Sequence, residues 1–477
     1  MVSDSTTQSG RYSFARAVVE GGLWFSGSSF AVKAVGIANT ILVLRLLSVY
    51  EYGLYHLVLA AYGLASVFFL SGFDQIVLAD LMRAKGEGDP GRARRIFSEF
   101  FLLKAGIGAA LFFAVFFGAR AVGSWYGADI AHLVRIISLL FLLVPLERAM
   151  NMVFNYHLSF RAMSLYTLTE EALKLVALLF FIFVAGMGVS GVVLAVVSAS
   201  AGAFVVFLPR AVRLFGAIPV PIPVPMRQES GRGPAFLLVS AFSDYGKWAV
   251  GFRYLGDFQR HLRPWLIRFF LSTEAVGIFA IAENMYGQVV GLVPLVNVFV
   301  PAVAQHIADR TGIRKLLYVC VKYGTPFFVI LGIASVPALW VLIYAVFPQY
   351  AEALPVFYIF LLTAFTAGVS NILMAVFYAE RRQRAHFFIM ASTVAVTLIF
   401  GILLIPAFGV AGIAMEFVIS AFFFNGARLW YLFRRYPELR FAPRLLFSFG
   451  AEDKALLRSA LSNARGLIFR FRNAPRA

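Results

Sequence analysis

The sequence predicts an all-α protein that crosses a membrane about twelve times and is built from two six-helix lobes. Composition is the first reason. Of the 477 residues, 61% are hydrophobic, and the mean hydropathy is +0.82, whereas a soluble domain averages about 45–50% apolar residues. The second reason is an internal repeat that divides the chain into two similar halves. The third is the alternation of charge between successive loops, which requires an even number of spans.

The repeat is clearest in residues 47–63 and 271–287, which lie 224 positions apart. Five of the seventeen aligned positions are identical. A second pair of segments repeats a two-glycine motif at an offset of 221, in which Gly188 and Gly191 return as Gly409 and Gly412. Two repeats at nearly one spacing indicate a duplication. In duplicated membrane proteins the binding site usually lies between the halves.

Twelve segments reach the ~20 mostly apolar residues that a spanning helix needs. They are 18–46, 54–80, 96–119, 131–155, 167–187, 189–212, 246–270, 275–303, 318–345, 353–378, 385–407 and 409–432. The seventh could instead lie at 234–252, which is more apolar. Adding the offset of 224 to 18–46 gives 242–270, so we place it at 246–270 and treat 234–245 as a juxtamembrane helix. Six spans in each half give both halves one orientation, related by an axis along the membrane normal.

The net charge of +18 is explained by membrane topology, so no nucleic-acid partner is expected. Lysine and arginine gather in alternate loops, namely 81–95, 156–166, 209–233, 304–315 and 379–385, and in the tail after Phe433. The turns between them carry no basic residue at 48–53, 185–188, 272–276, 347–353 and 405–408. This is the positive-inside pattern. It places both termini and all basic loops in the cytoplasm, and the polar first fifteen residues show no removable signal peptide.

Four regions follow from these patterns. Residues 1–212 form the first six-helix lobe, and 246–432 form the second. Between them, 213–245 holds alternating prolines at 218–225, which favour an extended linker. The basic tail 433–477 holds a segment, 452–472, that fits an amphipathic helix on the anionic leaflet; a solvated tail that only enforces topology explains it equally well.

Charged side chains interrupt the seventh span. An ionisable group in a span costs at least ~2.5–3.5 kcal/mol unless it faces a polar cavity or a partner. At ~100° per residue, one polar face carries Arg253, Asp257, Arg260, His261 and Arg268, while Arg263 lies to one side. The stripe should therefore line a water-filled cavity. Asp257 can partly neutralise the two flanking arginines, and a net positive charge remains.

Other spans also carry charges. Lys33 is the repeat equivalent of Asp257, because 33 + 224 = 257, so these two either face each other across the central cleft or bind ligand separately. We assign substrate binding to Lys33, Arg253, Arg260, Arg263 and His261, and coupling or charge balance to Asp257, Asp74 and Glu283. A purely structural charge network is the alternative. Lys104, Lys174 and Lys322 are expected to snorkel toward the interface, and Glu147 is expected to pair with Arg148.

The predicted ligand is anionic, because guanidinium groups bind phosphate bidentately and keep their charge in a partly dry site. No enzymatic activity is expected, because no Walker A motif, catalytic triad or metal-ligand spacing is present. The single cysteine, Cys320, lies in an apolar run and is predicted to be a small core residue. We expect no cofactor and no metal.

Several motifs resemble those of a known transporter family. Residues 44–55 read Leu44-Arg45-Leu46-Leu47-Ser48-Val49-Tyr50-Glu51-Tyr52-Gly53-Leu54-Tyr55. This segment is similar to a signature of the polysaccharide-export branch of the multidrug/oligosaccharidyl-lipid/polysaccharide (MOP) exporters. Residues 270–279 resemble its second-half counterpart. Loop 86–95 and the glycine turns at 188–191 and 409–412 also match that branch.

The resemblance implies a MATE/MOP-like fold and a Wzx-type flippase in the bacterial inner membrane. Its substrate would be an undecaprenyl-diphosphate-linked oligosaccharide, the repeat unit of the O-antigen of lipopolysaccharide or of an exopolysaccharide. Two lobes would move it to the periplasmic leaflet by alternating access, coupled to a proton or sodium gradient. A polysaccharide polymerase or another assembly protein is the expected partner. The chain departs from the family at Arg263, where many relatives carry aspartate, which leaves the coupling ion open.

Two alternatives remain from the sequence. A cation-coupled, MATE-like exporter of small molecules would use the same fold, although it fits poorly with a positive stripe. A non-transporting membrane component of a polysaccharide secretion complex would use the basic tail for docking.

Overall fold

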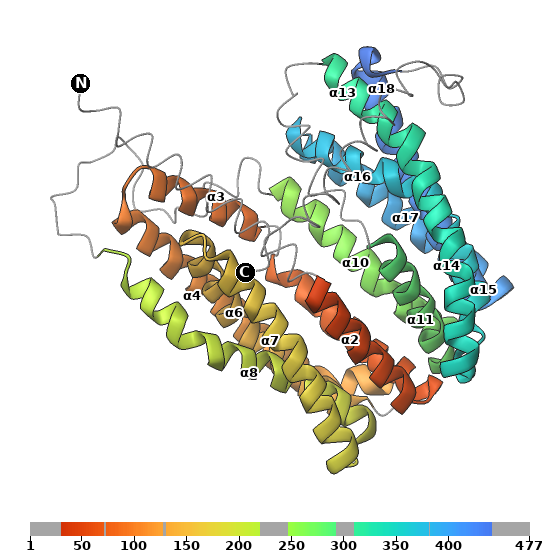
Figure 1. Cartoon of the computed structure of the whole chain (residues 1–477), viewed down its shortest axis with the longest axis horizontal. Helices are drawn as coiled ribbons and strands as arrows, with labels where there is room; N and C mark the ends of the chain where they lie inside the picture. The colour runs from red at the N-terminus through yellow and green to blue at the C-terminus, as the bar shows by residue number, and fades with distance from the viewer. Residues whose placement is uncertain are drawn as a thin grey trace, which may run out of the picture.

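The computed structural model describes residues 30–70, 73–126, 130–219, 247–291, 310–380 and 382–440. All regular secondary structure in these ranges is helical, as predicted (Figure 1). The first half, which we call the N-terminal lobe (30–219), begins with a helix over 30–46. It continues with α2 (Val49–Ser66), the short η1 (Val67–Phe69), α3 (Phe73–Gly86), α4 (Pro90–Tyr126), α5 (Ala131–Ser138), α6 (Leu140–Tyr156), α7 (Phe160–Leu179) and α8 (Gly188–Gly216).

The second half, the C-terminal lobe (247–440), has the corresponding order of helices. It contains α10 (Lys247–Phe270), α11 (Thr273–Val290), α13 (Arg310–Val319), α14 (Thr325–Val346), α15 (Ala353–Leu361), α16 (Ala364–Ala379), α17 (Gln383–Phe408), α18 (Val410–Arg435) and the short η6 (Pro437–Leu439). Most of the predicted linker, the juxtamembrane helix 234–245 and the tail segment 452–472 lie outside the described residues.

Where the structure describes them, the predicted spans fall on a helix or on consecutive helices. The repeat placed the seventh span at 246–270. In the described residues α10 runs from Lys247 to Phe270, in agreement with that placement, while most of the alternative, 234–252, lies outside the described residues. The second predicted span, 54–80, is wrong in its boundaries. The chain leaves α2 and η1 at Leu70, whose φ of 54° is left-handed, and a separate helix, α3, follows. Hydropathy stays high across this break and so did not reveal it.

Six helices of the described residues are long and apolar enough to cross a membrane, and a seventh is obtained if α15 and α16, bent by 54°, count as one span. The others are interrupted or polar. A break at Leu139 separates α5 from α6, and α10 carries the charged stripe. The chain is therefore a multi-pass membrane protein in which some spans contain polar faces.

The turns that carry no lysine or arginine gather at one end of the bundle; they are called uncharged only in that sense, because they hold Glu51, Glu274 and Glu352. The hydroxyl of Tyr350 donates to the carbonyl of Leu47 at 2.9 Å, and His132 lies 3.1 Å from the Ser190 hydroxyl. At the opposite end, Lys85 donates to the carbonyl of Tyr156. We call these the uncharged end and the basic end. Their separation confirms that successive loops alternate between the two sides.

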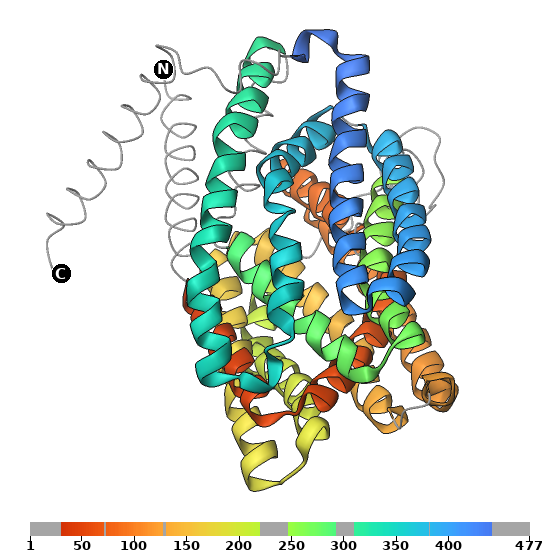
Figure 2. The same ribbon diagram turned by 90° about the vertical axis from the view of Figure 1, so that its right-hand side faces the viewer.

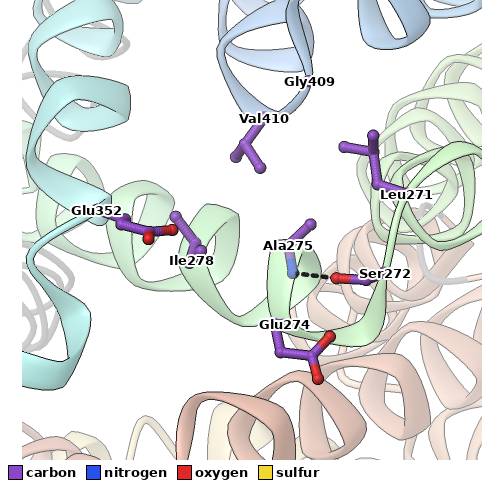
Figure 3. Close-up of a pocket in the computed structure, with 8 residues that line it drawn as sticks. All are labelled: Leu271, Ser272, Glu274, Ala275, Ile278, Glu352, Gly409 and Val410. Carbon is purple, nitrogen blue, oxygen red and sulfur yellow. Dashed lines mark hydrogen bonds between the residues drawn. The ribbon is translucent and has the colours of Figure 1, made fainter.

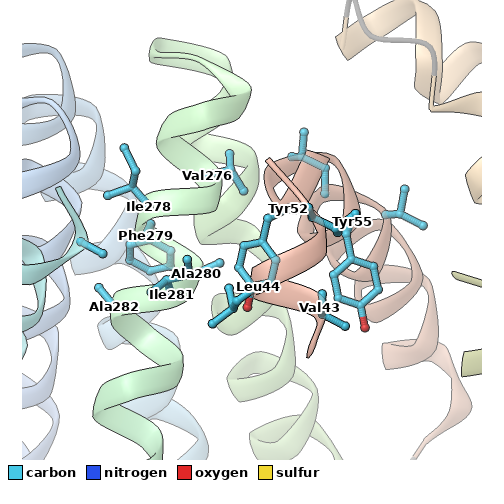
Figure 4. Packing of buried hydrophobic residues seen from close by; sticks show 14 of the residues in the cluster. Val43, Leu44, Tyr52, Tyr55, Val276, Ile278, Phe279, Ala280, Ile281 and Ala282 are labelled. Carbon is cyan, nitrogen blue, oxygen red and sulfur yellow. The ribbon is translucent and has the colours of Figure 1, made fainter. Parts of the chain in front are cut away.

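The duplicated segments pack directly against each other. Figure 4 shows the side chains of 43–55 facing those of 276–282 on α11. A Cβ at Gly53 would lie 2.0 Å from the carbonyl oxygen of Thr273, and a Cβ at Gly277 would lie 2.4 Å from that of Val49. These contacts are equivalent under the repeat, since 49 + 224 = 273 and 53 + 224 = 277. Such a reciprocal contact is the signature of a two-fold relation.

The same sequence features build both ends of this contact. Ser48 caps α2 by accepting from the Glu51 N–H at 3.2 Å, and Ser272 caps α11 by accepting from the Ala275 N–H at 3.3 Å. A serine cap satisfies an otherwise unpaired helical N–H. In Figure 1 the two groups of helices meet where α2 lies beside α10 and α11. Toward the other end of α10, Val250 joins the apolar cluster of Phe73 and Leu81 on α3, and Tyr254 contacts Phe68. Figure 2, with the second half facing the viewer, shows the same grouping.

Candidate functional site

The charged stripe lies along α10, the helix that packs against α2 of the other lobe. Nε of Arg253 donates to Oδ2 of Asp257 at 3.0 Å, and the two side chains are 62% and 27% exposed. Arg260 is exposed, and no carboxylate of the described residues lies within ion-pair distance of it. One carboxylate thus offsets one of two exposed arginines, and this face of α10 keeps a net positive charge.

Arg263 does not belong to this face. Its side chain is 8% exposed, and it forms a two-pronged ion pair with the fully buried Glu416 of α18, at 2.9 and 3.4 Å. The expectation that Arg263 binds substrate is therefore corrected, because its charge is neutralised inside the C-terminal lobe. The sequence had placed this residue to one side of the stripe, but it did not reveal a partner 153 positions away.

A chain of buried hydrogen bonds extends from this ion pair. The Ser420 hydroxyl donates to Glu416 at 2.5 Å and lies 2.9 Å from the Thr397 hydroxyl. The amide of Gln259 donates to Thr397 at 2.6 Å. These bonds join α10, α17 and α18, and a satisfied buried network of this kind fixes the relative positions of its helices. We assign it a structural role.

Lys33 and Asp257 do not face each other as a pair. Nζ of Lys33 donates to the carbonyl oxygen of Gly291 at 2.5 Å, at the end of α11, whereas Asp257 pairs with Arg253. Lys33 therefore links the two lobes through a backbone group. His261 lies against α2, since a Cβ at Gly63 would approach its ring to 2.2 Å.

Glu283 lies on α11, where Arg260 and Arg263 are near enough to interact with it electrostatically. It is partly buried, and no ion pair joins it to another described residue. Glu283 thus lies within electrostatic reach of both Arg260 of the exposed stripe and the buried Arg263. This position keeps it a candidate for coupling or charge balance.

Asp74 lies in a charge cluster of the N-terminal lobe. Nζ of Lys104 is 2.6 Å from its Oδ1, and Nη1 of Arg148 is 3.0 Å from its Oδ2. Two expectations are corrected here. Lys104 does not snorkel, because its side chain is 2% exposed, and Arg148 pairs with Asp74 rather than with Glu147. Lys322 is also buried, with Nζ donating to the Tyr318 hydroxyl at 2.7 Å.

Sequence reasoning missed a polar group on α7. The Ser200 hydroxyl donates to Glu170 at 2.6 Å, and the amide of buried Asn39 donates to Glu171 at 2.7 Å. Glu147 of α6 lies near Glu170. The adjacent glutamates on a predicted span were the available signal, because each carries the same energetic penalty as the charges that we did single out.

A pocket of about 390 Å³ lies at the uncharged end, away from the stripe. Figure 3 shows it between the start of α11, the turn before α18 and Glu352. Its wall includes Glu274, Ser272 and Gly409, with four apolar residues, and it contains no basic side chain. This pocket does not suit the predicted anionic ligand, and we assign it no part in binding.

The comparisons with known proteins agree with this architecture. The family model described as "Polysaccharide biosynthesis protein" matches residues 42–343, more than half of the chain. The chain belongs to the polysaccharide biosynthesis protein family. A search of curated proteins found no match. Among solved structures, this family member resembles the lipid II flippase MurJ in an inward closed conformation, with 13% identity, a TM-score of 0.64 and coverage of 86% of this chain and 87% of the other.

Two MATE transporters are similar as well. An inward-facing multidrug resistance MATE transporter of the MOP superfamily has 12% identity and a TM-score of 0.67, with 86% of this chain and 95% of that chain covered. A Vibrio cholerae MATE transporter has 14% identity and a TM-score of 0.59, with 90% and 99% covered. At these identities the likeness concerns the fold. The predicted MATE/MOP-like fold is confirmed.

Proposed function

We propose that this protein is a flippase that moves an undecaprenyl-diphosphate-linked oligosaccharide, an O-antigen or exopolysaccharide repeat unit, across the bacterial inner membrane. One observation carries the proposal: Arg253 and Arg260 are exposed on α10 with a net positive charge. A diphosphate needs such groups, because guanidinium forms charge-assisted, two-pronged bonds to phosphate oxygens. The family description, a polysaccharide biosynthesis protein, supports a polysaccharide precursor as the cargo.

The contact between the lobes supports alternating access. The lobes touch at the uncharged end through Gly53, Gly277 and the Tyr350–Leu47 hydrogen bond, and α10 also packs on the N-terminal lobe toward the basic end through Val250 and Tyr254. The positive-inside rule assigns the basic end to the cytoplasm. A lipid-linked substrate would enter from the cytoplasmic leaflet when the contacts of α10 at the basic end open, and it would leave after the contact at the uncharged end opens.

Coupling to a proton or sodium gradient is part of the proposal. Of the carboxylates named for it, Asp257 and Glu283 remain candidates because they lie on or beside the stripe. Asp74 is held in ion pairs by two cations, Lys104 and Arg148, so both of its carboxylate oxygens are occupied by protein groups, which makes it a weaker candidate for exchanging an ion. Lys33 and His261 lie at the boundary between the lobes and remain candidates for contact with the substrate.

A second candidate function is export of small molecules, supported by the structural similarity to MATE transporters. The net positive face of α10 disfavours it for cationic compounds, because like charges repel. A non-transporting component of a secretion complex would have no need for exposed arginines within a span.

The test uses a host strain that lacks the gene and is complemented with variants. Arg253→Gln and Arg260→Gln together should abolish surface polysaccharide while the protein stays in the membrane. Arg120→Gln removes an exposed arginine at the far end of α4 and should restore wild-type levels. Full surface polysaccharide from the double variant would refute the proposed site. Drug tolerance on overexpression, with unchanged polysaccharide in the deletion strain, would favour the exporter.

A further inference from the structure

The Asp74 cluster of the N-terminal lobe has more positive than negative charge. One carboxylate, at the start of α3, lies between the ammonium of Lys104 on α4 at 2.6 Å and the guanidinium of Arg148 on α6 at 3.0 Å. Within this cluster two cations and one anion leave one positive charge; the neighbouring Glu147 interacts electrostatically with Arg148 but forms no ion pair with it. A charge held in a span is expensive unless it meets a polar environment or a ligand, so the excess charge needs an explanation.

The two cations differ in what they can still bind. Lys104 is 2% exposed, and its ammonium also donates to the carbonyl of Phe69 and, at 3.5 Å, to that of Leu70. Its bonds are therefore used within the lobe, at the break between η1 and α3. Arg148 is 48% exposed, and its hydrogen bond to Asp74 occupies one of its two terminal nitrogens. A guanidinium has five N–H donors, so Arg148 keeps donors for another anion.

Arg148 lies within electrostatic reach of Tyr62 on α2. The next residue of α2, Gly63, packs against His261 of α10. The cluster also borders the other lobe. Phe68 of η1 contacts Tyr254 of α10, with ring centroids 6.0 Å apart, and Tyr254 follows Arg253. Arg148 thus lies beside α2, and its cluster borders η1; these are elements of its lobe that contact α10.

We propose that Arg148 is the residue through which the N-terminal lobe binds the anionic group of the substrate, and that Asp74 and Lys104 are its positioning residues. This inference rests on the proposed function. Asp74 orients the guanidinium through one hydrogen bond. Lys104 offsets the charge of Asp74, so that Arg148 keeps its own charge for the ligand. The substrate anion would then contact Arg148 on one lobe and Arg253 or Arg260 on the other.

This arrangement gives each lobe a share of one anion. A ligand that binds both lobes stabilises the conformation in which Arg148 of one lobe and the arginines of α10 in the other can contact it at the same time. Removal of Arg148 should therefore weaken anion binding even though Arg253 and Arg260 are intact. Removal of Lys104, which is too buried to touch a ligand, should weaken it as well, because the Asp74–Arg148 pair would become neutral.

The test uses the purified full-length protein in detergent, with inorganic pyrophosphate as the diphosphate probe and thermal unfolding as the readout. Sulfate at matched ionic strength controls for screening. Arg148→Gln should need about tenfold more pyrophosphate for the same stabilisation, the size expected for one charge-assisted hydrogen bond. Arg148→Lys should retain part of the response, Lys104→Met should lose part of it, and Arg120→Gln should match the wild type.

The outcomes separate the inference from the proposed function. If Arg148→Gln and Lys104→Met respond like the wild type while Arg253→Gln does not, the inference fails and the proposed site stands. If the wild type is not stabilised by pyrophosphate beyond sulfate, both fail. If Arg148→Gln does not fold, Lys104→Met decides, because it leaves the Asp74–Arg148 ion pair in place: an unchanged response overturns the inference.

Discussion

A methyl group added at Gly53 tests whether the lobes separate at the uncharged end during the transport cycle. The Cβ of Gly53→Ala would lie 2.0 Å from the carbonyl oxygen of Thr273, whereas real Cβ contacts essentially never fall below 3.0 Å. Backbone atoms cannot yield as a flexible side chain does, so α2 and α11 must move apart by about 1.0 Å, the difference between these two distances.

Overpacking of this kind costs about 1–3 kcal/mol. The contact exists only while the lobes are joined at this end, so the penalty falls on that state and not on the opposite one. A bias of this size shifts a two-state equilibrium by roughly 5- to 150-fold. Gly53→Ala should therefore increase the fraction of molecules that are open at the uncharged end.

Labelling of a single cysteine measures that fraction. Cys320 is the only cysteine, so Cys320→Ala with Leu47→Cys provides one thiol at a position that is 2% exposed in the joined state. Gly53→Ala should raise its maleimide labelling rate at least about fivefold. Gly118→Ala on α4 is the matched control, because a Cβ there meets nothing within 4 Å. Equal labelling rates in the two alanine variants would refute the reasoning.

Three further predictions concern stability and binding. Arg263→Met should lower the free energy of unfolding by about 3–5 kcal/mol, because it leaves Glu416 charged and buried without a partner. The double variant Arg263→Met, Glu416→Gln should regain most of that free energy, as measured by thermal unfolding. Tyr350→Phe should leave the Leu47 carbonyl unpaired, weaken the joined state by about 1–3 kcal/mol and raise labelling at the uncharged end. Arg253→Gln should change stability by less than about 1 kcal/mol yet abolish surface polysaccharide, and a large loss of stability would mark it as structural.

Much of the architecture could be predicted because the duplication constrains it. The offset of 224 placed the end of α10 at residue 270, where the helix ends, although hydropathy favoured a different segment. The same offset brought Gly53 and Gly277 into correspondence, and the structure shows that they pack against each other. The break at Leu70 was not predicted in this way, since neither the repeat nor the length of an apolar stretch reports a single left-handed residue.

The candidate site was predicted less completely. Helical periodicity shows which residues share a face, and it separated Arg263 from Arg253 and Arg260. It cannot identify partners on other helices, and both Arg263 and Lys104 find carboxylates far away in sequence. Snorkelling was the wrong interpretation of Lys104 for that reason. Charged residues within a span are thus reliable markers of polar structure, but only the tertiary contacts distinguish a buried ion pair from an exposed ligand-binding group.

The most direct test of the central claim is transfer of substrate in reconstituted vesicles. Purified protein would be placed in liposomes that contain a polyprenyl-diphosphate-linked oligosaccharide, and the sugar accessible to an added lectin would be followed over time. The wild type and Arg120→Gln should expose sugar from the inner leaflet, whereas the Arg253→Gln, Arg260→Gln double variant should not. Wild-type vesicles that behave like protein-free vesicles, or a double variant as fast as the wild type, would contradict the account.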